Sequence, residues 1–238
     1  MRPERRPTIG PGMCGLALFL GAIGPAWADD AKPSYPLMAP VGQYRMASAS
    51  EEIALARSAA PPSISGDAEV MTLGGNGYET AVKGKNGFIC MVQRGWAADF
   101  DDPVFWNPRN RSPICFNPAA ARSILPGYLE RTKWVLAGVS KADMLDRTKA
   151  ELAANTYTMP EAGAMSYMMS KQGYLNDAVG HWHPHLMFFL AHTDGAAWGA
   201  DLDGSPVFAA KGNPEPVTTF FVPVPKWSDG TSAAMETH

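Results

Sequence analysis

The densest group of chemically active side chains in this 238-residue chain is a run of alternating histidines. His181, His183 and His185 are two residues apart, and in an extended strand such residues point to the same side. Neighbouring imidazoles would lie roughly 6.6 Å apart along the strand, which allows two of them to close on one ion. His181 and His185 are too far apart to share it unless the chain bends at Pro184. The pattern therefore predicts a metal site built on one neighbouring pair.

The residues around the histidines indicate which ion such a pair would hold. Asp177 and Asp194 are the candidate carboxylate ligands. Imidazole and sulfur ligands favour a soft or borderline ion, here zinc or copper. An ion with an open position could activate water, as in a metal-dependent enzyme. The other interpretation is that the histidines only form hydrogen bonds between neighbouring strands. Four methionines fall on nearby predicted strands: Met165, Met168, Met169 and Met187.

A second candidate site is a ligand pocket beside a long aromatic segment. Residues 96–113 are expected to form one irregular loop, and loops of this length in compact domains are commonly functional. Trp96, Phe105 and Trp106 lie in or beside this loop, and Trp182 lies in the histidine segment. These rings would form apolar walls, as small-ligand pockets generally have. They would equally suit a structural lid over the core, so both interpretations stay open.

Two cysteines, Cys90 and Cys115, lie downstream of the N-terminal segment. An even number of cysteines in an exported chain favours a disulfide, and two buried thiols are the alternative. We therefore predict a disulfide between Cys90 and Cys115.

The first 28 residues have the three parts of a secretory signal peptide. Arg2, Arg5 and Arg6 form a basic start, and residues 13–23 form an apolar run that is too short to span a bilayer. Residues 26–28, Ala-Trp-Ala, match a cleavage site. We expect a secreted, soluble, periplasmic protein that begins at Asp29. The Arg5-Arg6 pair leaves the export route open between the general secretory and twin-arginine pathways.

The composition argues against several classes of partner. The formal net charge is −3 and no run of Lys and Arg is present, so the charge pattern does not predict nucleic-acid binding. No second apolar stretch approaches the roughly 20 residues of a transmembrane helix, so we expect no membrane span in the mature chain. The Gly-x-Ser-x-Gly, His-Glu-x-x-His and phosphate-binding loop motifs do not occur. The sequence does not indicate an oligomeric state.

The order of the predicted elements indicates the fold class. We expect a helix at 50–60, strands at 68–73, 78–83 and 88–94, helices at 119–125, 128–137 and 141–154, and strands at 164–170, 185–192, 206–211 and 217–224. The dipeptide Asn86-Gly87 predicts a hairpin between the second and third strands. This order is typical of an α+β domain with a mostly antiparallel sheet and helices packed on one side. The predicted boundaries are a signal peptide at 1–28, a flexible leader at 29–47, a single domain at 48–225 and a polar tail at 226–238.

Five segments spread over most of the mature chain carry a further resemblance. They are residues 86–90, 115–122, 167–170, 180–189 and 226–230. Together they resemble a group of exported bacterial proteins to which no activity is assigned. The resemblance implies secretion and a single domain, and it implies no function.

These observations favour a secreted, non-catalytic protein that binds a small ligand or a metal ion through residues 181–185. The alternative is a metal-dependent periplasmic enzyme, with a histidine pair and Asp177 or Asp194 as metal ligands. A structural or interaction protein of the cell envelope is the third interpretation.

Overall fold

The computed structural model describes residues 35–177 and 180–233. The predicted signal peptide, residues 1–28, lies outside the described residues. In chain order the elements are η1 (Val41–Tyr44), α1 (Ala49–Arg57), α2 (Pro62–Ser65), β1 (Glu69–Leu73), β2 (Tyr78–Val82), β3 (Ile89–Gln93), η2 (Gly95–Ala97), β4 (Ser112–Phe116), α3 (Pro118–Ser123), α4 (Leu125–Leu136), α5 (Lys141–Ala153), β5 (Met165–Met168), β6 (His185–Ala191), η3 (Gly195–Trp198), β7 (Phe208–Lys211) and β8 (Val217–Pro223), where η denotes a 3-10 helix.

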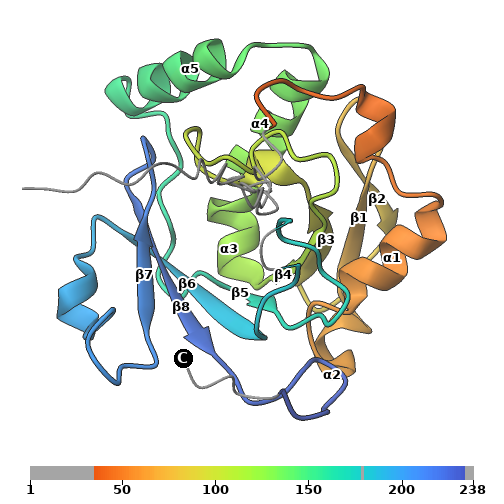
Figure 1. Ribbon diagram of the computed structural model, residues 1–238, viewed down its shortest axis with the longest axis vertical. Helices are drawn as coiled ribbons and strands as arrows, with labels where there is room; N and C mark the ends of the chain where they lie inside the picture. Colours follow the sequence, from red (N-terminus) through yellow and green to blue (C-terminus); the bar gives the residue numbers. More distant parts are fainter. Residues whose placement is uncertain (1–34, 178–179, 234–238) are drawn as a thin grey trace, which may run out of the picture. The chain divides into compact units, whose positions relative to one another are not determined.

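The strands of the described part of the chain form one sheet in the order β2-β1-β3-β4-β5-β6-β8-β7 (Figure 1). Neighbouring strands are antiparallel, apart from β1 and β3, which are parallel. The predicted α+β class with a mostly antiparallel sheet is confirmed. The sheet has two halves, β1 to β4 and β5 to β8, each continuous in sequence. They meet where β4 pairs with β5 through two residue pairs, Cys115 with Tyr167 and Phe116 with Ser166.

Two of the central helices begin at the residues that the capping pattern predicts. Asn117 Oδ1 accepts the Ala120 N–H at 2.9 Å, and Pro118 is the first residue of α3. Ser140 Oγ accepts the Asp143 N–H at 3.1 Å at the start of α5. These bonds satisfy amide groups that the first turn of a helix leaves without a partner.

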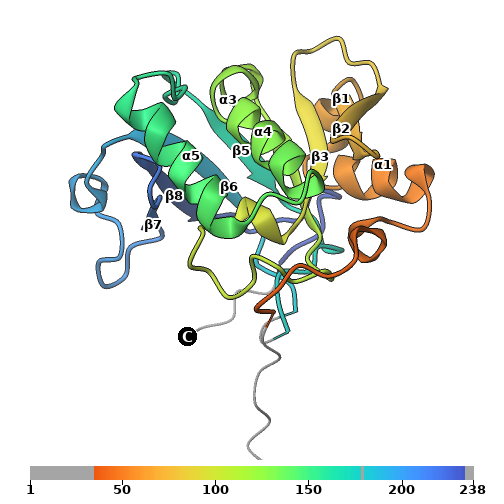
Figure 2. The same ribbon diagram turned by 90° about the horizontal axis from the view of Figure 1, so that it is seen from above.

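The two faces of the sheet carry separate hydrophobic clusters. Along β3, Cys90 and Val92 pack with α1 residues such as Leu55, whereas Met91 packs with α4 residues such as Tyr128. Successive side chains of a strand point to opposite faces, so α1 and α4 lie on opposite faces. Figure 2 shows α3, α4 and α5 on the same side of the sheet. The helices are therefore not confined to one side, because α1 covers the other face at β1, β3 and β4.

Strand β4 was not predicted, because residues 96–113 were expected to form one loop. All five of its residues are buried, and it pairs with β3 along its whole length. Proline has no N–H to donate to a neighbouring strand, and Pro113 lies opposite Val92. The Phe88 carbonyl accepts the Glu69 N–H of β1, and alternate residues of a strand direct their backbone groups to the same neighbour, so the Val92 carbonyl also faces β1. Pro113 therefore leaves no bond to β3 unmade, and the Val92 carbonyl accepts hydrogen bonds from Tyr78 Oη, at 2.6 Å, and from the Arg94 guanidinium.

The predicted hairpin at Asn86-Gly87 is wrong. β2 pairs with β1, and β3 pairs with the other edge of β1, so β2 and β3 are not neighbours. Asn86 nevertheless makes a turn, because its Oδ1 accepts the Phe88 N–H at 3.0 Å and Gly87 has a φ of +78°. The turn redirects the chain across β1 instead of joining adjacent strands.

A buried ion pair lies at the end of β3. The Arg94 and Glu52 side chains are 0% and 5% exposed, and Arg94 Nη2 lies 2.8 Å from Glu52 Oε1. Arg94 Nε also donates to the Tyr44 carbonyl at 2.7 Å, and Glu52 Oε1 accepts the Leu73 N–H at 3.2 Å. The pair therefore joins η1, α1, β1 and β3.

The segment expected to be a flexible leader packs on the domain from residue 35 onward. Tyr44 is fully buried, and its hydroxyl donates to the Trp106 carbonyl at 2.9 Å. Arg111 Nη2 donates to the carbonyls of Gln43 and Arg45, at 3.1 and 3.2 Å. Residues 35–47 are therefore part of the domain, because a buried tyrosine and an arginine fasten them; residues 29–34 lie outside the described residues.

The expected polar tail also has an ordered part. Ser228 N–H donates to the Met169 carbonyl at 3.0 Å, Lys226 forms a β-bridge with Ser232, and Ala233 is buried. Residues 226–233 therefore belong to the domain, and residues 234–238 lie outside the described residues.

The predicted disulfide between Cys90 and Cys115 is present. The two cysteines are directly opposite each other on β3 and β4, and both are fully buried in the cluster beneath α1. The disulfide thus fastens β3 to β4 two residues away from Pro113.

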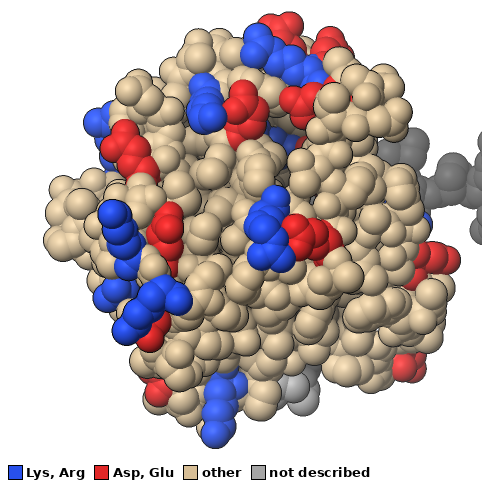
Figure 3. Space-filling view, turned by 180° about the vertical axis from the view of Figure 1, so that it is seen from behind, with Lys and Arg blue, Asp and Glu red and all other residues tan. Residues whose placement is uncertain are grey.

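Charges of both signs are mixed over the face shown in Figure 3, where Lys and Arg lie next to Asp and Glu. Uncharged surface separates these groups, so this face carries no broad field of one sign. Within residues 35–177 and 180–233, no helix has both the length and the apolar character needed to cross a bilayer.

Candidate functional site

A pocket of about 400 Å³ lies between the sheet face that carries Met187 and Phe189 and helices α4 and α5. Its volume falls in the usual range for small-molecule sites, about 300–1,000 Å³. Residues from both halves of the sheet line it, so it spans the junction between β4 and β5.

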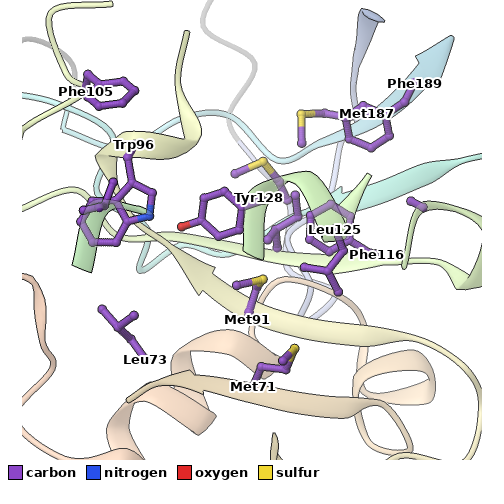
Figure 4. Packing of buried hydrophobic residues seen from close by; sticks show 14 of the residues in the cluster. Met71, Leu73, Met91, Trp96, Phe105, Phe116, Leu125, Tyr128, Met187 and Phe189 are labelled. Atoms are coloured by element: carbon purple, nitrogen blue, oxygen red, sulfur yellow. The ribbon is translucent and has the colours of Figure 1, made fainter. Parts of the chain in front are cut away.

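The floor of the pocket is apolar. Alternate residues of neighbouring strands point to the same face, and those that reach the pocket are Ile114, Phe116, Met168, Met187, Phe189 and Phe221. Figure 4 shows Met187 and Phe189 on one side of Tyr128, and Trp96 and Phe105 on its other side. The floor therefore continues the main hydrophobic cluster, to which most of these residues belong.

A part-buried ion pair forms one side of the rim. Arg131, from α4, contacts Glu215, from the turn before β8, and each side chain is 12% exposed. Arg131 Nη1 also donates to the carbonyls of Trp96 and Ala98, at 3.2 and 3.0 Å. The guanidinium lies 4.4 Å from the centre of the Phe100 ring. Arg131 thus fastens α4 to two separate segments of the rim.

The rest of the rim is rich in acidic groups. Burial and the neighbouring Glu215 carboxylate raise the pKa of Asp99, which accepts the backbone N–H of Asn213. Burial and the same carboxylate raise the pKa of Tyr157 above its usual value. Arg131, which pairs with Glu215, lowers the pKa of Asp99 less than burial and Glu215 raise it. The rim therefore favours a neutral or cationic group over an anion. Further acidic lining residues are Asp102, Glu130 and Glu151.

The predicted histidine site is not assembled. The ring of His181 stacks on Trp227, with ring centres 5.8 Å apart. His185 Nδ1 instead lies 2.7 Å from the His183 carbonyl oxygen, and burial lowers the pKa of His185. The two rings thus have separate partners.

The two predicted carboxylate ligands are engaged elsewhere. Asp177 accepts hydrogen bonds from Tyr35 and Tyr174 and pairs with Arg109 at 2.8 Å. Asp194 accepts the Ala196 N–H at 3.5 Å at the start of η3. Among the described residues, no three His, Cys, Asp or Glu side chains come together as metal ligands.

The predicted aromatic walls are mostly core. Trp96, Phe105 and Trp106 are 0%, 1% and 7% exposed, and Trp96 Nε1 donates to Thr132 Oγ1 at 3.0 Å. Trp182 Nε1 donates to the Met168 carbonyl at 3.2 Å. The 96–113 segment does border the pocket, but through other residues: Ala97, Ala98, Asp99, Asp102, Val104 and Asn110.

The sequence reasoning missed Asp99, Arg131, Tyr157 and Glu215. One signal was available on α4, where Arg131 lies three residues after buried Tyr128 and four before buried Val135. Residues at these spacings share a helix face, so a charged group on the inner stripe indicated a buried partner. No family model, curated protein or solved structure matches this chain.

Proposed function

We propose that this chain is an exported, non-catalytic protein that binds a small molecule in the pocket between the sheet and α4. The observation that carries the proposal is the pocket itself, with its apolar floor and its few polar groups on the rim, the usual composition of a ligand site. The disulfide supports an oxidising compartment, in line with the secretory pattern of residues 1–28.

The lining indicates the chemistry of the ligand. Phenylalanine and methionine on the floor suit an apolar body. Asp99 and the Arg131–Glu215 pair suit a neutral or cationic polar end. We therefore expect an alkyl amine or alcohol to bind better than a carboxylate of the same length.

The test uses a neutral environment-sensitive dye as the probe and octylamine, octanol and octanoate as competitors. Gly127 is the residue to change, because a Cβ built there meets only Tyr157 Oη, at 4.0 Å, outside its own helix. Gly127→Leu would place an apolar side chain in the pocket and also suits a helix better than glycine. The matched control is Gly42→Leu, because Gly42 lies outside the pocket and its Cβ would meet no atom within 4 Å.

We expect the dye to bind at one site per chain, and Gly127→Leu to weaken binding at least about tenfold without loss of stability. Octylamine should displace the dye better than octanoate. Equal binding by Gly127→Leu, or no dye binding by the parent chain, would refute the proposal. Stoichiometric zinc that is lost on His183→Ala would instead support the metal-dependent enzyme.

A further inference from the structure

One corner of the sheet brings together soft donor atoms, two of which belong to residues of the pocket floor. Met168 lies opposite His185, and Ser166 lies opposite Met187, across the β5–β6 pair. Directly opposite residues of antiparallel strands project from the same face, with Cβ atoms about 4.5–5.5 Å apart. His185 and Met187 are two residues apart and share that face as well. One imidazole and two thioethers therefore project from the same small area.

The hydrogen bond of the His185 imidazole gives it the tautomer that a metal ligand requires. Its Nδ1 lies 2.7 Å from the His183 carbonyl oxygen, and a carbonyl can only accept. Nδ1 therefore carries the hydrogen, which leaves the Nε2 lone pair free. Metal-binding histidines usually have the second ring nitrogen fixed in this way. The rings of Phe221 and Trp182, centred 5.7 and 6.3 Å away, hold the imidazole in place.

The other donors of this corner are also buried. Met168 and Met187 are 7% and 8% exposed, and both line the pocket, which gives an ion a path to them. Ser166, on the same face, is fully buried, and its hydroxyl has no hydrogen-bond partner among the described residues. An oxygen donor is thus present beside the two thioethers.

We propose that His185, Met168 and Met187 form a binding site for monovalent copper. Thioether sulfur is a soft ligand that selects Cu(I), whereas zinc prefers thiolate, imidazole and carboxylate. The apolar surroundings keep water and competing hard ions away. This ligand set comes from two strands, so it differs from the His181–His183–His185 set predicted from spacing. It does not depend on the proposed small-molecule ligand.

The test is an anaerobic titration of the full chain with Cu(I), with ascorbate as reductant and bicinchoninate as a competing chelator. All samples carry Cys14→Ser, which leaves the disulfide-bonded Cys90 and Cys115 as the remaining cysteines. We expect one Cu(I) per chain and no displacement by Zn(II). Met168→Leu and Met187→Leu should each weaken binding at least about tenfold, and X-ray absorption should show sulfur as well as nitrogen around the copper.

The matched control is Met165→Leu. Met165 lies on the same strand but pairs with Phe188 and has the opposite parity, so it points to the other face. It should retain the parent affinity. Met-to-Leu changes are nearly volume-conserving, and thermal unfolding without copper checks that each variant folds. Parent-like binding by the double variant Met168→Leu/Met187→Leu, or copper surrounded by nitrogen alone, would overturn the proposal.

Discussion

Removing Glu52 from its pair with Arg94 is the sharpest test of the buried polar network. Glu52→Leu removes the charge and puts an apolar side chain of similar size at the same buried position. Arg94 would keep its bond to the Tyr44 carbonyl, at 2.7 Å, and its contact with the Val92 carbonyl. It would lose its carboxylate, however, and breaking a buried ion pair costs about 3–5 kcal/mol. Because the Tyr44 and Val92 carbonyls still solvate the guanidinium, we expect a cost at the lower end of this range, about 3 kcal/mol.

A second loss adds to the first. The Leu73 N–H donates to Glu52 Oε1 at 3.2 Å and would be left without this acceptor. An unsatisfied buried N–H costs about 1 kcal/mol or more. We therefore expect Glu52→Leu to lower the free energy of unfolding by about 4 kcal/mol, which corresponds to a melting temperature lower by roughly 8–16 °C for a domain of this size.

The assay is urea unfolding followed by tryptophan fluorescence, with the disulfide intact. The double variant Glu52→Leu/Arg94→Met should be no less stable than Glu52→Leu, because no uncompensated charge remains. Glu161→Leu is the control: its partner Arg122 is largely exposed, so unfolding should change little. A loss below about 1 kcal/mol for Glu52→Leu would refute the reasoning, since it lies within the range of an exposed pair.

Three further predictions concern the disulfide and two titrating groups. Replacing Cys90 and Cys115 by alanine should cost about 3.5 kcal/mol in urea unfolding, because the bridge closes a loop with a sequence separation of 25; an unchanged midpoint would contradict this. Burial lowers the pKa of His185, so the neutral imidazole stabilises the fold fully above about pH 6.5. This stabilisation is lost as the pH falls and the ring must take up a proton. His185→Gln should therefore show a shallower loss of stability between about pH 7 and pH 5 than the parent chain, and parallel curves would disprove it. Burial raises the pKa of Asp99, which means that its charged form destabilises the fold at neutral pH; Asp99→Asn should raise the melting temperature at about pH 7 but not at about pH 4.

The helices and most strands were predictable because their signals are local. Asn117 and Ser140 mark helix starts by their own side-chain bonds, and the alternation along residues 78–83 is visible without the partner strand. Strand β4 was missed because proline is rare inside a sheet. Pro113 is tolerated because its nitrogen faces away from β3 and the β5 ladder reaches only Cys115 and Phe116. The register of β4 against two distant strands decides this, so no local pattern indicates it.

The site was predictable only in part, because its residues meet through the tertiary fold. Asp99, Arg131 and Glu215 come from a loop, a helix and a turn, and their sequence positions carry no sign of their proximity. An aromatic residue in a long loop suits a pocket wall and a core equally well. The full burial of Trp96, which depends on Thr132 and its neighbours, decides between the two.

The narrow junction between β4 and β5 has a consequence for how the chain could be divided. The β4–β5 ladder has two residue pairs, and backbone bonds of Asn117 to Met165 and of Arg111 to Tyr174 lie beside it. Helices α3 to α5 fill the sequence between the two strands. A cut at Gly138, where a Cβ would meet no atom within 4 Å, would yield two fragments with four consecutive strands each. Such fragments would recombine through buried side chains and a few backbone bonds instead of a long ladder, so this protein is suited to split-protein complementation.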